Sequence, residues 1–111
     1  MWFIFPQIDG LGYSSTARFY AIKGKDEAKA YLNHPLLRKR LVECSEALLL
    51  IKGKSAEEIF GNPDDLKLRS SMTLFASVTE SDSIFSRVLD QYYDNRPDGR
   101  TLELLKQVST R

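Results

Sequence analysis

The sequence has little cysteine, little histidine and no excess of charge of either sign. Of 111 residues, one is a cysteine, Cys44, and one is a histidine, His34. A single cysteine excludes an internal disulfide, and no group of cysteines and histidines has the spacing of a zinc site. Sixteen basic and fifteen acidic residues leave a formal net charge of +1, so no basic field favours nucleic acid or an anionic membrane. We expect a reduced, cytoplasmic protein with neither a metal nor a cofactor.

Long apolar runs and glycine-rich phosphate loops are also absent. No apolar stretch approaches the roughly 18 to 20 residues that would span a bilayer, and neither familiar spacing of phosphate-binding glycines occurs. The chain is 42% hydrophobic and 28% charged, which is typical of a folded domain and not of a disordered chain. A chain of this length buries roughly 65% of the surface that its unfolded form exposes. Residues 1–111 are therefore expected to form a single domain.

Helix signals recur along the chain, whereas strand signals are scarce. Apolar residues and caps predict seven short helices, near 14–24, 26–33, 36–51, 55–60, 63–78, 81–92 and 101–108. Ser55 and Glu58 have the spacing of a capping box, and Asn62 is expected to cap the helix that follows it. The fold class predicted is all-α, a single compact irregular bundle of about six or seven short helices.

The first five residues are all apolar, and three of them are aromatic: Trp2, Phe3 and Phe5. A signal peptide would need a basic start, a longer apolar stretch and a cleavage site. Large aromatic residues usually pack in a core, yet these stand at the start of the chain, where termini are commonly polar. We therefore expect that an upstream N-terminal helix is missing here. The aromatics left uncovered would then favour a homodimer.

Three segments occur together in this chain, MWFIFPQIDGLG at 1–12, EAKAYLNHP at 27–35 and IFGNPDDLKLRSSMTLF at 59–75. With them, nearly the whole sequence resembles the domain-of-unknown-function family eighteen-ten, some members of which carry the label calpastatin. The resemblance implies the all-helical fold of a similar mycobacterial protein, whose activity is unassigned. It implies no chemistry, and inhibitor function does not follow from the label, because calpastatins are long and disordered. Family members continue upstream with a helix, in line with the missing element expected above.

The helix expected at 63–78 carries the best candidate binding surface. Asp65 and Arg69 stand at i and i+4, a spacing that allows an intrahelical ion pair. Lys67, Ser70 and Ser71 share another face, and one cation with two hydroxyls can bind a phosphate or a carboxylate. In the alternative interpretation, hydroxyls on this helix donate to carbonyl groups four residues earlier or permit close helix packing.

Three further residues are candidates outside that helix. His34 is the only side chain suited to general acid–base chemistry near neutral pH, although it can instead cap the C-terminus of the preceding helix. Arg40 belongs to the basic run 38–40 and directly precedes the core residue Leu41, so partial burial would single it out. Gln7 can present its amide to a ligand, or it can hold the backbone of the glycine-containing loop that follows.

These candidates suggest a cleft with an aromatic wall of Trp2, Phe5 and Tyr31. An aromatic wall with cationic donors suits a small phosphorylated or nucleotide-like anion. The ligand-binding residues expected are Trp2, Gln7, His34, Arg40, Asp65, Lys67, Arg69, Ser70 and Ser71. The alternative is a protein-interaction module or an oligomer subunit without catalytic activity. Whether the protein is an enzyme stays open, and neither nucleic acid nor a membrane is expected as a partner.

Overall fold

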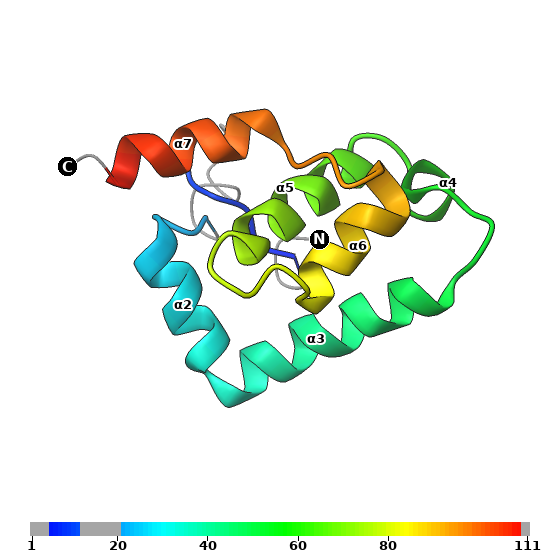
Figure 1. Ribbon diagram of the computed structural model, residues 1–111, viewed down its shortest axis with the longest axis horizontal. Coiled ribbons are helices and arrows are strands. Elements are labelled where there is room, and N and C mark those ends of the chain that lie inside the picture. The colour runs from blue at the N-terminus through cyan, green and yellow to red at the C-terminus, as the bar shows by residue number, and fades with distance from the viewer. Residues whose placement is uncertain (1–4, 12–20, 110–111) are drawn as a thin grey trace.

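The structure, a computed structural model, describes residues 5–11 and 21–109, except for the side chains of 107–109. In these residues the chain forms six helices, as Figure 1 shows: α2 (Lys25–Asn33), α3 (Pro35–Leu50), α4 (Ala56–Phe60), α5 (Asp64–Ala76), α6 (Ile84–Tyr93) and α7 (Gly99–Ser109). The predicted all-α class is therefore confirmed. Most of the helix expected near 14–24 lies outside the described residues, and its last part, 21–24, is not helical.

Local capping chemistry sets where α4 begins. The Ser55 hydroxyl accepts from the Glu58 backbone N–H at 3.1 Å, and the Ser55 N–H donates to the Glu58 carboxylate at 2.9 Å. These two bonds form the predicted capping box. They stabilise the ionised carboxylate, so hydrogen bonding to the Ser55 backbone and side chain lowers the pKa of Glu58.

Three helix starts differ from the sequence prediction in their cap or their position. Asn62 does not cap α5, because its amide donates to the Asp65 carboxylate at 3.3 Å. α6 begins two or three residues later than expected, because the Ser83 hydroxyl accepts from the Ser86 N–H at 3.4 Å. α7 begins two residues earlier than expected, and the Asp98 carboxylate accepts from the Thr101 N–H at 2.9 Å. At α6 and α7 a side chain close to the first turn fixes the boundary, whereas α5 begins after Pro63 without a side-chain cap.

Helix α5 lies at the centre of the fold, and the other helices surround it (Figure 1). It packs against α2, α4, α6 and α7, and seven of its thirteen residues are buried: Leu68, Ser70, Ser71, Met72, Thr73, Leu74 and Phe75. The Phe75 ring is fully buried between two other rings, with centroids 5.4 Å from Tyr31 on α2 and 5.6 Å from Phe85 on α6. This aromatic cluster joins three helices, so it holds α2 and α6 in place around α5.

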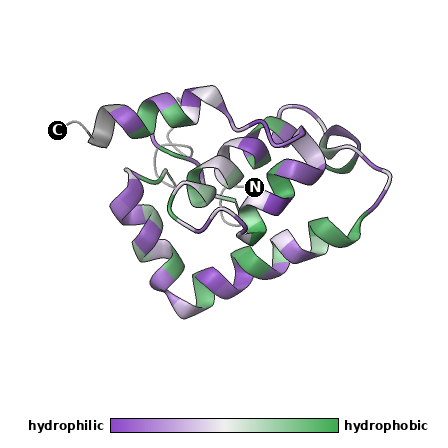
Figure 2. Ribbon diagram, viewed as in Figure 1, coloured by the Kyte–Doolittle hydropathy of each residue, from purple (hydrophilic) through white to green (hydrophobic). Residues whose placement is uncertain are grey.

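Helices α2 and α3 form a corner along one side of the molecule (Figure 1), and α6 holds the far end of α3. The Tyr92 hydroxyl donates to the Leu48 carbonyl, and the Gln91 amide donates to the Ile51 carbonyl at 2.8 Å. These carbonyls are at the C-terminal end of α3, where the helix supplies no partner of its own. In Figure 2 purple and green alternate along α2 and α3, the pattern of helices with one face on the core.

The N-terminal segment is tied to the chain just before α2. Ile8 pairs with Ile22 in an isolated parallel bridge, with the Ile22 N–H donating to the Gln7 carbonyl at 2.8 Å. Phe5 is buried and packs edge-to-face on Phe60, their ring centroids 6.3 Å apart. The prediction that this aromatic run packs in the core is thus confirmed for Phe5, while Trp2 lies outside the described residues.

Candidate functional site

The Arg69 side chain, an expected ligand residue, is held by the main chain between α6 and α7. Its Nε donates to the Arg96 carbonyl at 2.9 Å, and its Nη2 donates to the Pro97 carbonyl at 3.2 Å. The guanidinium carbon also lies 5.8 Å from the centroid of the Tyr93 ring, a cation–π distance. Arg69 therefore joins α5 to the α6–α7 connection instead of forming the ion pair with Asp65 that the spacing allows.

Ser70 and Thr73 are engaged in the same way. The Ser70 hydroxyl donates to the Leu66 carbonyl at 3.1 Å, and the Thr73 hydroxyl donates to the Arg69 carbonyl at 2.8 Å. The Thr73 oxygen also accepts from the Asp98 N–H at 2.8 Å, and the Asp98 carboxylate lies 3.4 Å from the Ser70 hydroxyl. The back-bonding alternative is confirmed for both hydroxyls, which together fix the start of α7.

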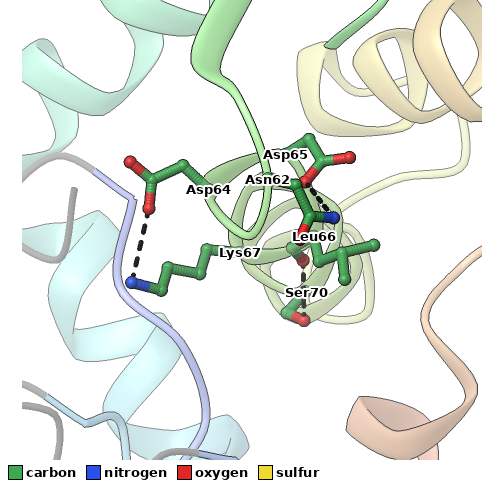
Figure 3. A network of polar contacts seen from close by, with 6 residues as sticks. All are labelled: Asn62, Asp64, Asp65, Leu66, Lys67 and Ser70. Carbon is green, nitrogen blue, oxygen red and sulfur yellow. Dashed lines mark hydrogen bonds and ion pairs between the residues drawn. The ribbon is translucent and has the colours of Figure 1, made fainter. Parts of the chain in front are cut away.

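Figure 3 shows the polar residues at the start of α5 pointing in different directions around the helix. The Lys67 ammonium pairs with the Asp64 carboxylate at 3.3 Å on one side, and the Ser70 hydroxyl lies on another (Figure 3). The Ser71 hydroxyl is fully buried and has no hydrogen-bond partner in the described part of the chain. Lys67, Ser70 and Ser71 therefore do not present one open cationic face, and their ligand role stays a prediction.

The Tyr93 hydroxyl completes this region from α6. It donates to the Asp65 carbonyl. Burial, followed by the nearby Asp65 carboxylate, raises the pKa of Tyr93 well above its usual value. The phenol thus stays protonated and serves as a fixed donor that anchors the start of α5 to the end of α6.

His34 has a structural role at the α2–α3 junction. Its Nδ1 accepts from the Leu37 N–H at 3.3 Å, so the side chain caps the N-terminus of α3. The expected alternative is confirmed for the backbone, because His34 is also the C-cap of α2, where its N–H donates to the Tyr31 carbonyl at 3.2 Å. The side chain itself serves the N–H groups of the next helix. Pro35 follows at the first position of α3, where a missing N–H has no cost.

We predict that His34→Ala lowers the free energy of unfolding by about 1 kcal/mol, the usual loss when an N-cap acceptor is removed. His34→Asn should retain most of the stability, because the asparagine side chain is also a good N-cap. Chemical denaturation of both variants measures the difference. Equal losses in the two variants would show that capping is not what His34 contributes.

The remaining candidates that the structure describes are Arg40, Gln7, Phe5 and Tyr31. Arg40 is exposed, so the partial burial that would have singled it out is not observed. Tyr31 is half-buried against Phe75, and burial raises its pKa while the nearby Arg40 charge partly opposes that rise. The Gln7 carbonyl accepts a hydrogen bond from the Ile22 N–H. The proposed aromatic wall therefore reduces, in the described residues, to Phe5 and Tyr31, both of which pack against other rings.

A groove of about 630 Å³ lies elsewhere, where the α5–α6 connection faces α2 and α3. This volume is within the range of about 300 to 1,000 Å³ that is typical of small-molecule sites. Its apolar residues come from all these elements: Leu32, Val42, Val78, Ile84 and Phe85. Its polar residues are Lys29, Asn33, Arg38, Thr79, Glu80 and Ser83. Of the nine residues expected from the sequence, Trp2 lies outside the described residues, and none of the other eight lines the groove.

The charged groups of the groove are largely uncompensated. Lys29 on α2 and Arg38 on α3 are both exposed, and neither side chain forms an ion pair or a hydrogen bond with any residue that the structure describes. Glu80, in the α5–α6 connection, is the one carboxylate among the lining residues that the structure describes. These described residues carry a net charge of +1, and their two cations come from the α2–α3 corner.

The hydroxyls of the groove already have partners. The Thr79 hydroxyl donates to the Phe75 carbonyl at 2.8 Å and lies 3.0 Å from the Ser83 hydroxyl. The Ser83 oxygen in turn accepts from the Ser86 N–H. These side chains hold the α5–α6 connection and the start of α6 together, so they shape one wall of the groove.

Sequence reasoning missed this groove, although one signal pointed near it. Arg38 belongs to the basic run 38–40, but the sequence favoured Arg40 because that residue directly precedes the core residue Leu41. The two residues differ by two positions, which is about 200° around a helix, so only one of them can face the α5–α6 connection. Lys29 gave no signal of its own, because a lysine on a short amphipathic helix normally belongs to a solvated face.

Metal and membrane features are not found in the described residues. Across 5–11 and 21–109, no cluster of three or more histidine, cysteine, aspartate or glutamate side chains is placed to hold a metal ion. Within the same ranges, no helix has the length and apolar composition required to cross a bilayer.

Comparison with known proteins gives a family and a fold. Residues 1–105 match the model of a family described as protein of unknown function (DUF1810). The crystal structure of the conserved hypothetical protein Rv1873 from Mycobacterium tuberculosis is 51% identical in sequence, with a TM-score of 0.91. The alignment covers 95% of this chain and 75% of that chain. No curated protein matches the sequence.

Proposed function

Because the chain belongs to the DUF1810 family, whose description states no function, we propose from its geometry that it binds a small organic anion in the groove between α2, α3 and the α5–α6 connection. The observation that carries this proposal is a pair of cations, Lys29 and Arg38, that have no partner among the described residues and lie beside an apolar floor. Ligand sites commonly combine such a floor with a few polar groups that fix orientation. Phosphorylated and carboxylate compounds both fit this description.

Exposed apolar surface in the groove supports the same proposal. Leu32, Val42, Val78 and Ile84 are half-buried, so part of each side chain faces the open volume. A small apolar ligand body would cover this area and gain roughly 25 cal/mol for each Å² removed from water. The anionic end would meet Lys29 and Arg38 through charge-assisted hydrogen bonds.

Removal of the two cations tests the proposal. We expect Lys29→Ala and Arg38→Ala each to weaken binding of a small anion about tenfold, which corresponds to roughly 1.4 kcal/mol. Isothermal titration with octanoate, octyl phosphate and adenosine monophosphate covers the classes considered. Binding should also weaken as salt is added, because both cations are exposed to solvent.

The matched control is the double variant Lys39→Ala/Arg40→Ala. It removes the same charge from α3, at residues that do not line the groove. If Lys29→Ala/Arg38→Ala and this control bind all three anions equally, or if the wild type binds none of them, the groove is not an anion site.

The alternative function, a protein-interaction module, has its own observation. Leu50 at the end of α3 is 82% exposed, and Leu36 at its start is 50% exposed. In Figure 2 the C-terminal end of α3 is green, the colour of hydrophobic residues. The homodimer expected through the N-terminal aromatics stays a prediction. The cytoplasmic location also stays a prediction, and the single cysteine supports it.

A further inference from the structure

Resting on the proposed function, we infer that the groove takes an aliphatic monocarboxylate, with its carboxylate at Lys29 and Arg38 and its hydrocarbon chain along the floor. Three properties of the groove separate this class from phosphorylated sugars and nucleotides, which share the anionic end. They are the floor, the charge and the hydrogen-bonding groups.

The floor is built for a hydrocarbon chain and not for a flat base. Four of its five apolar residues are aliphatic: Leu32, Val42, Val78 and Ile84. The fifth, Phe85, is only 3% exposed, and its ring packs against Phe75. A nucleobase gains much of its affinity by stacking on an exposed aromatic face. No such face is offered by the lining residues that lie within 5–11 and 21–106.

The charge of the lining favours a monoanion. Lys29 and Arg38 supply two positive charges and Glu80 supplies one negative charge, so the sum is +1. A carboxylate carries one negative charge, whereas a phosphate monoester carries about −1.5 to −2 near neutral pH. The charge of the lining therefore balances the charge of a monocarboxylate. Part of the charge of a phosphomonoester would stay unbalanced beside Glu80.

The hydrogen-bonding groups favour a ligand with few hydroxyls. Thr79 and Ser83 are already bonded to each other, to the Phe75 carbonyl and to the Ser86 N–H. The Asn33 amide can meet one or two sugar hydroxyls. Further hydroxyls would have to displace the bonds of Thr79 and Ser83 or stay without protein partners, and either costs affinity. A hydrocarbon chain makes no such demand.

A chain-length series tests the inference. Titration of the full chain with butanoate, hexanoate and octanoate, below micelle-forming concentrations, should give a Kd that falls about two- to fourfold per added methylene, the upper figure being a fully buried CH₂. Octyl phosphate should bind more weakly than octanoate, and adenosine monophosphate more weakly still. All carboxylate binding should weaken about tenfold in Arg38→Ala and stay unchanged in Arg40→Ala.

The outcomes separate this inference from the proposed function. A Kd independent of chain length, or tighter binding of adenosine monophosphate than of octanoate, overturns the aliphatic ligand while the anion site stands if Arg38→Ala still weakens binding. Loss of all Arg38 dependence overturns both. In a sedimentation assay with vesicles of phosphatidylcholine and phosphatidylglycerol, the protein should stay in solution. Sedimentation that depends on Arg38 would show that the groove binds a membrane lipid, and it would overturn the inference.

Discussion

Replacement of Phe75 by alanine is expected to lower the free energy of unfolding by about 3 to 5 kcal/mol, the range for loss of a large buried aromatic side chain. Phe75 is fully buried on α5, and its ring contacts Tyr31 on α2 and Phe85 on α6. Removal of the ring leaves a cavity at the point where three helices meet. A domain of this size has a total stability of about 5 to 15 kcal/mol, so this single substitution should remove a large part of it.

Urea denaturation monitored by circular dichroism measures this loss, and two variants calibrate it. Phe75→Leu keeps most of the volume and should cost less than half as much. Leu50→Ala removes a large apolar side chain that is 82% exposed, and it should change stability by no more than about 0.5 kcal/mol. A Phe75→Ala variant as stable as Leu50→Ala would contradict the central place of α5 in the core.

The second large effect is expected for Arg69→Met, which should lower the free energy of unfolding by about 2 to 3 kcal/mol. The substitution keeps an apolar stem but removes two charged donors from the Arg96 and Pro97 carbonyls, and hydrogen bonds to charged groups contribute about 1.5 to 3 kcal/mol each before solvent exposure reduces them. It also removes the cation–π contact with Tyr93. The α6–α7 connection should lose its attachment to α5.

Arg69→Lys should recover little of this stability, because an ammonium cannot donate to both carbonyls with the geometry of a guanidinium. Arg40→Met is the control, since Arg40 is exposed and its loss should change stability by no more than about 0.5 kcal/mol. Octanoate binding should survive in Arg69→Met at temperatures where that variant is folded. Loss of binding with unchanged stability would instead make Arg69 a ligand residue, as the sequence suggested.

Much of the fold could be predicted from the sequence because helix signals are local. The capping box at Ser55 and the apolar face of α3 need only a few neighbouring residues, and both are found where expected. Helix starts were harder, since several nearby polar residues can serve as caps. At α6, for example, Ser81 and Asp82 compete with Ser83, and only the packing decides which side chain faces the first turn.

The site was harder to predict because no single segment contains it. Lys29, Arg38 and Glu80 are brought together by the α2–α3 corner and the α5–α6 connection, and no spacing in the sequence encodes that contact. The sequence favours a binding surface on α5 because polar side chains interrupt an apolar helix. Ser70 and Thr73 have a structural reason for that pattern, since both tie α5 to the Asp98 segment. Their polarity is needed for packing around the central helix.

The most direct test of the anion site is a map of where octanoate binds, from amide chemical-shift changes in ¹⁵N-labelled protein. A site in the groove predicts that the largest changes fall in 29–42 and 78–85, the segments that form it, and that they disappear in Lys29→Ala/Arg38→Ala. Changes concentrated in 65–73 would contradict it, because they would place the ligand on the face of α5 that the structure closes with Arg69, Ser70 and Thr73.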